Sequence, residues 1–353
     1  MNVLFLYSEV AAYFLSCAET LHRVYGCQVH VVRWPVNPEA PFKFRDYEGV
    51  IFHERKELDD KALYELYERI APEVVYVSGW MDKGYVKLAR EIRKKGIPVI
   101  CGSDNHWRGD LRQWVAAAAS PFVLKPAYSH FWVPGLYQFE FARRMGYDRR
   151  NILTGMYSAD TQSFLKAGDI ALEQKQDHYP HVFLYVGRYV ASKGVSDLYE
   201  AFVRLSAETR HDWRLLMVGA GPMQQQMPAH PAVTFRDFVQ PEELPQLAAQ
   251  GGCFVLPSRN EPWGVVMHEF AAAGLPVLAS DACGSATAFL RDGYNGYAHA
   301  AGDPGSLLAA LRRIIETSDE QLLRMGERSR ELSRQITTES WAAAFMSVLP
   351  NVE

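Results

Sequence analysis

The chain has 353 residues, more than one ordinary hydrophobic core requires, and this length fits two domains of typical size. Apolar residues make up 48% and charged residues 22%, so the composition is that of a globular protein and excludes a disordered chain. The formal net charge of -4 excludes a positive field over the whole molecule, and we expect no nucleic-acid partner.

The cysteines and the apolar runs indicate the cellular compartment in which we expect the protein. The five cysteines are scattered and form no Cys-x-x-Cys pair, which indicates reduced thiols rather than a disulfide framework or a zinc site. No basic leader precedes the first apolar run. No stretch approaches about 20 apolar residues, and the nearest one, 114–124, is alanine-rich and contains Pro121. We expect a cytoplasmic protein, with contact at the inner face of a membrane left open. The cysteines are Cys17, Cys27, Cys101, Cys253 and Cys283.

Short apolar runs alternate with helical patterns through the first half of the chain. Apolar strands separated by helices predict parallel β-α-β units whose sheet is covered on both faces. We therefore expect an N-terminal Rossmann-like domain over residues 1–170. Its predicted strands are 3–7, 29–32, 49–52, 74–78, 98–101 and 131–133, and its predicted helices are 15–25, 61–70 and 85–95.

The alternation restarts after a polar segment, 165–180, which we interpret as the link between two domains. A second Rossmann-like domain is expected over residues 180–335, and a C-terminal helix of about 338–353 is expected to pack back on the first domain. Two doubly wound α/β sheets would face each other across a cleft, with ligands at the carboxyl ends of the strands. The predicted strands are 182–186, 214–218, 233–235, 252–256 and 276–279, and the predicted helices are 303–316, 320–333 and 338–349.

Two cations follow the first strand of the second half. Arg188 and Lys193 lie on the loop between that strand and Gly194, which precedes a helical pattern. A guanidinium and an ammonium at such a place can hold a diphosphate, the first through paired donors and the second as a point charge. The alternative is a solvated loop that happens to carry two charges.

Two carboxylates follow a later strand. Glu261 comes after 252–256, and Glu269 lies eight residues further on, beyond a turn shaped by Pro262 and Gly264. Both carboxylates can face one ligand, Glu261 toward a transferred sugar and Glu269 toward the paired hydroxyls of a ribose. Glu269 can instead be an exposed helix residue, but its apolar neighbours predict a mostly buried helix on which a carboxylate needs a partner.

Taken in order, the motifs of the second half resemble glycosyltransferase family 4, the retaining glycosyl transferases group 1, which have the GT-B fold. The resemblance runs from about residue 182 to 315. Its elements are Gly187-Arg188 with Lys193-Gly194, Gly219-Ala-Gly-Pro222, the Glu261-x7-Glu269 spacing, and Gly274 to Ser280 with Asp292-Gly-Tyr-Asn-Gly296.

The resemblance implies a set of site residues in this chain. Arg188 and Lys193 would neutralise the leaving diphosphate, in place of the metal ion that other transferases use, so no metal or other cofactor is expected. Glu269 would bind the ribose and Glu261 the donor sugar. Backbone contacts are implied for Trp263, Gly264 and Val265 to sugar or phosphate, for Asp237, Phe238 and Val239 to the base, and for the loops at Gly187 and Gly219.

The first half resembles the same family more weakly, at 131–146 and 151–164. A histidine after the fifth strand is common in the family near the reacting sugar, which makes His106 the candidate and Asp104 its alternative; a surface histidine is the other interpretation. The loop after the first strand lacks the paired glycines of many relatives, so a backbone approach to phosphate is not expected there. Ser8, Glu9 and Tyr13 are candidates to face the acceptor.

Two clusters of basic residues leave a membrane contact open. They suit anionic lipid if the acceptor is lipid-linked, but such clusters are more often solvated helix ends. The clusters are Arg90, Arg93, Lys94 and Lys95, and Arg143, Arg144, Arg149 and Arg150.

The expected activity is transfer of a sugar from a nucleotide-sugar to an acceptor hydroxyl with retention of configuration. UDP- and GDP-sugars are the favoured donors and ADP-sugars stay open; the acceptor is a glycan, a lipid-linked sugar or a small molecule. The rival interpretations are a sugar-nucleotide epimerase or hydrolase on the same fold and a nucleotide-sugar-binding protein without catalysis, which fold analogy alone does not separate.

Overall fold

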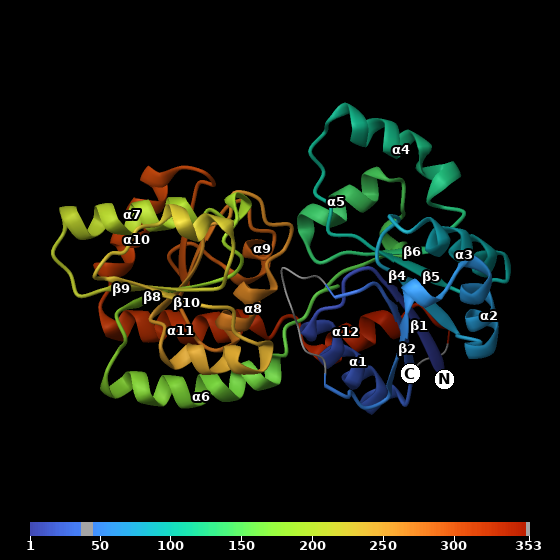
Figure 1. Cartoon of the computed structure of the whole chain (residues 1–353), viewed down its shortest axis with the longest axis horizontal. Coiled ribbons are helices and arrows are strands. Elements are labelled where there is room, and N and C mark those ends of the chain that lie inside the picture. The colour runs from blue at the N-terminus through green and yellow to red at the C-terminus, as the bar shows by residue number, and fades with distance from the viewer. Residues whose placement is uncertain (37–44, 351–353) are drawn as a thin grey trace. The chain divides into compact units, whose positions relative to one another are not determined.

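The computed structural model describes residues 1–36 and 45–350, and the chain divides into two compact units (Figure 1). Unit 1 comprises Met1–Ser158 and Thr338–Glu353, and unit 2 comprises Ala159–Thr337. Each unit contains a parallel sheet flanked by helices. The predicted α/β class with two Rossmann-like domains is confirmed.

Over its described residues, unit 1 has a seven-stranded sheet in the order β3-β2-β1-β4-β5-β6-β7. The first strand, β1, pairs in parallel with β2 on one side and with β4 on the other. The order of strands therefore reverses between β1 and β4. The strands are β1 (Asn2–Tyr7), β2 (Gln28–Arg33), β3 (Val50–Glu54), β4 (Val74–Val77), β5 (Val99–Gly102), β6 (His130–Trp132) and β7 (Ile152–Leu153).

Alternate residues of β1 enter two different cores. Leu4 and Leu6 join the core shared with α2 and α3, whereas Val3 and Phe5 join the core shared with α1 and α12. This is the period of two that a strand imposes on its side chains. The helical elements of unit 1 are α1 (Ala12–Tyr25), η1 (Arg55–Glu57), α2 (Asp60–Ile70), α3 (Lys83–Lys94), α4 (Leu111–Val123), α5 (Leu136–Arg144), η2 (Arg149–Asn151) and α12 (Thr338–Met346).

The C-terminal helix α12 belongs to unit 1. Trp341 and Phe345 stack on Phe5, and the indole N–H of Trp341 donates to the carbonyl oxygen of Met156 at 2.8 Å. The last residues of the predicted 338–353 stretch, 351–353, lie outside the described residues.

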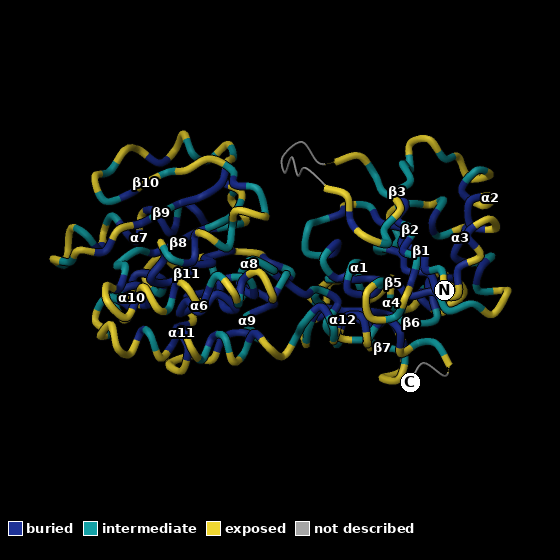
Figure 2. The backbone as a smooth tube through the Cα atoms, turned by 90° about the horizontal axis from the view of Figure 1, so that it is seen from below, coloured by how far each residue is buried: buried dark blue, intermediate teal, exposed yellow. Residues whose placement is uncertain are grey.

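Over its described residues, unit 2 has a six-stranded parallel sheet in the order β10-β9-β8-β11-β12-β13. Its order reverses between β8 and β11. In Figure 2 the central strands lie in the buried interior of each unit, whereas the edge strands β3 and β10 and the outer faces of the helices are partly exposed. The strands are β8 (Val182–Val186), β9 (Arg214–Val218), β10 (Val233–Arg236), β11 (Cys253–Leu256), β12 (Val277–Ser280) and β13 (Gly296–His299). The helical elements are α6 (Thr161–Asp177), η3 (Ala191–Lys193), α7 (Val195–Glu208), η4 (Pro222–Gln226), η5 (Pro241–Ala249), α8 (Val265–Ala272), α9 (Ala286–Phe289), α10 (Pro304–Ile315) and α11 (Asp319–Ser333).

The predicted link at 165–180 is wrong, because most of that segment is helix α6 of unit 2. Phe164 and Ala171 are buried, and a Cβ atom on Gly168 would lie 2.7 Å from the carbonyl oxygen of Ala273, so α6 packs tightly against the end of α8. Lys166, Asp169, Glu173 and Asp177 lie on the exposed face of this helix, whereas Lys175 is buried. The unit boundaries fall instead at 158/159 and 337/338.

No helix in the described part of the chain combines the length and the apolar character needed to cross a bilayer. The alanine-rich segment 114–124 lies in α4, which has 13 residues.

Candidate functional site

The topology of unit 2 brings the predicted charged residues together. Lys193 lies on the loop that follows β8, and Glu261 lies on the loop that follows β11. These adjacent strands flank the point where the strand order reverses, and ligands of open α/β sheets bind at such a point, outside the carboxyl ends of the strands.

Lys193 and Glu261 form an ion pair between Nζ and Oε2, and the Ser258 hydroxyl also donates to Oε2 at 3.4 Å. The Glu261 side chain is 8% exposed and that of Lys193 is 20% exposed. Separating a largely desolvated pair leaves two uncompensated charges, so a ligand that does so has to supply an anion to Lys193 and hydroxyl donors to Glu261.

Backbone contacts join the loops around this pair. The carbonyl oxygen of Ser192 accepts from the N–H groups of Arg259 and Asn260 at 2.9 and 3.1 Å. Gly194 has φ 64°, and a Cβ atom there would lie 2.1 Å from the carbonyl oxygen of Pro257. Only glycine fits this position, because it combines a left-handed conformation with a close backbone approach.

The next loop along the sheet packs just as closely. A Cβ atom on Gly219, which has φ 140°, would lie 2.0 Å from the carbonyl oxygen of Gly187. The N–H of Tyr189 donates to the carbonyl oxygen of Ala220 at 2.8 Å, and the N–H of Gly219 donates to that of Arg236 at 2.9 Å. The loops after β8, β9, β10 and β11 therefore form one continuous edge.

The helices that begin at this edge have open N-termini. Helix α7 follows Gly194 and helix α8 follows Gly264, and neither has a side-chain cap among the described residues. By contrast α10, which follows β13 of the same sheet, is capped by the side chain of Asp303. The first N–H groups of a helix lack intrahelical partners and carry partial positive charge, so α7 and α8 present donors to an anion.

Glu269 lies in α8 and is half-buried. Burial, with a smaller effect of the negative charge of Asp160, raises the pKa of Glu269 to about 8. Among the described residues no side chain or backbone group makes a hydrogen bond with the Glu269 carboxyl. The partner that the sequence argument required is thus not supplied by the described protein groups, and hydroxyl groups of a ligand have the donors that this carboxylate lacks.

The other predicted donor contacts are spread along the same edge. Arg188 is exposed, and its carbonyl oxygen accepts from the Tyr185 hydroxyl at 2.9 Å. The Trp263 ring is buried, and the contact predicted for this residue is through its backbone. Val265 begins α8, and Asp237, Phe238 and Val239 follow edge strand β10.

Two buried polar atoms near this edge lack a hydrogen-bond partner among the described residues. They are the Tyr189 hydroxyl and the Trp263 indole nitrogen. Both residues follow strands that flank the reversal of strand order. Unsatisfied buried groups are rare in folded proteins, and each one calls for an explanation such as a functional role.

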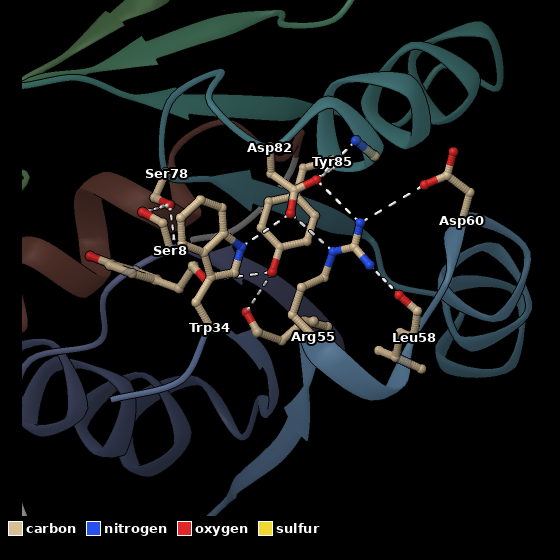
Figure 3. A network of polar contacts seen from close by, with 11 residues as sticks. Ser8, Trp34, Arg55, Leu58, Asp60, Ser78, Asp82 and Tyr85 are labelled. Carbon is tan, nitrogen blue, oxygen red and sulfur yellow. Dashed lines mark hydrogen bonds and ion pairs between the residues drawn. The ribbon is translucent and has the colours of Figure 1, made fainter. Parts of the chain in front are cut away.

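In unit 1, the reversal point lies between β1 and β4, and the described residues there place two serines where unit 2 has a charged pair. The N–H of Ser8 donates to the Ser78 hydroxyl at 2.8 Å, and the two hydroxyls lie 3.0 Å apart. Figure 3 shows these serines beside a denser network around Asp82.

Asp82 is the centre of that network. Its carboxylate accepts from the Trp34 indole N–H at 3.1 Å, from Arg55 Nε at 3.0 Å and from the N–H groups of Gly84 and Tyr85 at 2.8 and 3.1 Å (Figure 3). Burial alone would raise the pKa of Asp82, but its hydrogen bonds, led by the one from Arg55, hold the pKa below its usual value.

The predicted acceptor residues of unit 1 lie on two loops. Tyr157 connects two of them, because its hydroxyl donates to Asp104 at 3.4 Å and its ring meets Tyr13 edge to face at 5.5 Å. His106 packs edge to face on Tyr137 at 5.3 Å. Glu9 is exposed on the loop between β1 and α1.

Four further residues lie next to the predicted ones and were not predicted from the sequence. Tyr157 joins Tyr13 to Asp104, Ser258 contacts Glu261, and Asp160 raises the pKa of Glu269. The fourth is His268, whose ring contacts the N–H of Ala159 at 3.1 Å and the carbonyl oxygen of Ser333 at 2.9 Å. Ser258 lies only three residues before Glu261, whereas the other three meet their partners through the tertiary fold.

No group of three or more histidine, cysteine, aspartate or glutamate side chains gathers as a metal site in residues 1–36 and 45–350. The five cysteines are free and buried.

The second half of the chain is similar to known proteins. Residues 170–332 match the model of the family Glycosyl transferases group 1. The glycogen synthase of Mycobacterium tuberculosis is 35% identical over 144 residues, which cover 39% of this chain and 34% of that protein. The match thus spans about a third of the length of that curated relative.

Solved structures match over nearly the whole chain. The structure of Anabaena HepE in complex with UDP has a TM-score of 0.73 at 16% identity, covering 99% of this chain and 100% of that one. Sucrose-phosphate synthase of Thermosynechococcus elongatus has a TM-score of 0.72 at 17% identity, covering 99% and 98%. At such identities the likeness shows the fold. The second unit of this chain belongs to the glycosyl transferases group 1 family, and the chain has the GT-B fold of glycosyltransferases.

Proposed function

We propose that this chain is a glycosyltransferase that moves a sugar from a nucleotide-sugar, UDP- or GDP-linked, to a hydroxyl group of an acceptor with retention of configuration. The observation that carries the proposal is the Lys193–Glu261 pair at the reversal point of unit 2, between the open N-termini of α7 and α8. The pair lies within the segment that matches the transferase family. Anabaena HepE, which shares the fold, was solved in complex with UDP, and this supports a UDP-sugar as the first donor to test.

In this proposal the donor replaces the contacts that Lys193 and Glu261 make with each other. The diphosphate accepts hydrogen bonds from Lys193, Arg188 and the first N–H groups of α7 and α8. Hydroxyl groups of the sugar donate to the Glu261 carboxylate. The ribose hydroxyls donate to Glu269. Donors that are already oriented toward the diphosphate stabilise the charge that develops as it leaves, so the reaction needs no metal ion.

The reaction then proceeds at one face of the sugar. The acceptor oxygen forms a bond to the anomeric carbon as the bond from that carbon to the diphosphate breaks. The acceptor proton passes to a diphosphate oxygen, which balances the charge and needs no protein nucleophile. Candidate residues for acceptor contacts are Ser8, Glu9, Tyr13, Asp104 and His106, and the acceptor is a glycan, a lipid-linked sugar or a small molecule.

The test is binding of UDP-, GDP- and ADP-sugars in the presence of a chelator, measured by calorimetry or thermal shift. We expect one nucleotide class to bind the wild-type chain and the affinity to fall at least about tenfold in Lys193→Ala and in Glu269→Ala, the loss typical of a charged hydrogen bond. Lys166→Ala, a lysine on α6 away from the strand ends, is the matched control and keeps full affinity.

Turnover separates the rival functions. Donor consumed without any acceptor would indicate an epimerase or hydrolase, and binding without turnover against any acceptor pool would indicate a sensor. Absence of binding by every nucleotide-sugar, or binding that both variants keep, would overturn the site assignment.

A further inference from the structure

Helix α4 of unit 1 turns its large apolar side chains outward. Leu111, Trp114 and Phe122 are 79%, 52% and 81% exposed, and Val115 is 61% exposed. These positions follow the spacing i, i+3, i+4 and i+11, so they form one stripe along the helix. A helix of a globular protein ordinarily turns such a stripe toward the core.

The inner face of α4 is small and polar instead. Ser120 is the buried residue of this helix, and its hydroxyl donates to the carbonyl oxygen of Met145 at 2.7 Å. The Gln113 side chain donates to the carbonyl oxygen of His106 at 2.7 Å, and Asp110 caps the helix. These polar contacts, with the edge-to-face contact of Trp114 on Trp107 at 5.2 Å, attach α4 to unit 1, while Leu111, Val115 and Phe122 stay mostly exposed. In Figure 1, α4 lies at the periphery of unit 1.

The surroundings of the stripe are basic. Residues 108–150 contain seven arginine or lysine residues and three acidic ones, whereas the whole chain has a net charge of -4. Arg112 and Lys125 are exposed on α4 and just after it. The Arg144 guanidinium lies over the Trp114 ring, 6.0 Å from its centroid.

The other basic cluster is partly neutralised. Lys94 pairs with Glu91 at 2.8 Å, and Lys95 pairs with Glu68. Arg144 is paired as well, with Glu140 at 2.6 Å, so the positive charge beside the apolar stripe comes mainly from the exposed Arg112 and Lys125.

We propose that the α4 stripe, defined as Leu111, Trp114, Val115 and Phe122, docks on the surface of an anionic lipid bilayer. Leucine, tryptophan and phenylalanine on one face with arginine and lysine beside them are the features of a helix that lies in the plane of a bilayer surface. Anionic headgroups supply the negative charge that residues 108–150 attract. The polar inner face of α4 stays on unit 1.

A second copy of this chain is a less suitable occupant. A two-fold contact through the stripe brings each surface against itself, so Arg112, Lys125 and Arg144 of one protomer would meet the same residues of the other. Like charges that approach in this way repel, whereas an anionic bilayer compensates them.

The test is flotation of the full chain with vesicles of phosphatidylcholine alone and of phosphatidylcholine with about 30% phosphatidylglycerol. We expect the wild-type chain to float with the anionic vesicles, and less so at high salt. The variant with Leu111→Ser, Trp114→Ser and Phe122→Ser should lose more than about tenfold of this binding, because each large apolar side chain contributes to partitioning. Arg112→Glu with Lys125→Glu should lose the preference for anionic vesicles.

Ile170→Ser is the matched control, because Ile170 is 54% exposed on α6 of unit 2. It should float like the wild type. The exposed positions in α4 should also leave the melting temperature of the triple variant near that of the wild type, which separates a lost contact from a lost fold.

Three outcomes would overturn the proposal. They are no flotation of the wild-type chain with either vesicle, equal flotation of the triple variant, and equal flotation of the wild type with both vesicles. Light scattering after gel filtration tests whether a second copy of the chain occupies the stripe instead. A wild-type dimer together with a monomeric triple variant would assign the stripe to a second copy.

Discussion

The two units have the same kind of sheet but use the point where the strand order reverses in different ways. In unit 1, Ser8 and Ser78 bond to each other there, and the nearby Asp82 is saturated by five donor groups that include two Arg55 nitrogens. In unit 2, Lys193 and Glu261 form a pair between helices that have no side-chain caps among the described residues.

The difference separates groups that stabilise the fold from groups that are available to a ligand. A carboxylate that already accepts from an indole, a guanidinium and a helix N-terminus has no capacity left for a substrate. Open helix N-termini and the Glu269 carboxyl retain that capacity. The fold is shared, and the chemistry lies in the residues after each strand.

The largest expected effect concerns turnover at the charged pair of unit 2. Lys193→Ala should lower kcat by about 10²–10³, as the loss of one preorganised charge-stabilising donor does. Steady-state kinetics with the nucleotide-sugar found by binding measures this. Ser78→Ala, at the reversal point of unit 1, should keep the donor affinity of the wild type. A Lys193→Ala enzyme with near-normal kcat would remove Lys193 from the mechanism.

The next effect concerns the stability of unit 1. Asp82→Ala leaves Arg55 without its main partner and removes the cap of α3, which should cost about 3–5 kcal/mol of unfolding free energy. Asp59→Ala removes only the exposed cap of α2 and should cost about 1 kcal/mol. Urea unfolding of the wild type and of both variants measures the two losses of unfolding free energy. Equal costs would show that the network around Asp82 adds nothing to an ordinary cap.

The smallest effect concerns Glu269 and pH. Its pKa is about 8 in the folded chain and near 4.5 when unfolded, so the folded state holds the proton more tightly. This contribution to stability is complete below pH 4.5 and is lost as pH rises toward 8. Glu269→Gln should therefore gain about 1–2 kcal/mol relative to the wild type between pH 5 and pH 8, after allowance for partial exposure.

Unfolding free energies of both proteins at several pH values check this prediction. A constant difference between them would mean that the pKa of Glu269 is the same in the folded and unfolded chain. Saturating donor should reduce the gain, because ribose hydroxyls that donate to the carboxylate favour its charged form.

Much of the fold could be predicted from the sequence. The apolar strands and several of the helices between them were predicted because their periodicity is local, although β7, β13 and α4 were missed and α6 was taken for a link. Glu261 and Lys193 could also be placed at one edge, since parallel strands end on the same side of a sheet. Their mutual pairing could not be predicted, because it depends on the neighbouring positions of β8 and β11 in the sheet.

The sequence by itself determined the α/β alternation, the family of the second unit and the loops that carry its charged residues. Each of these depends on the spacing of residues that lie close together in the sequence. The tertiary structure decided which polar groups are already satisfied. It showed Asp82 saturated, Glu269 without a hydrogen-bond partner in the described part of the chain, α6 packed into unit 2 where a link was expected, and the α4 stripe exposed. The physical reason is that burial and hydrogen bonding depend on which distant segments pack together, and amphipathic spacing alone does not say which face of a helix meets the core.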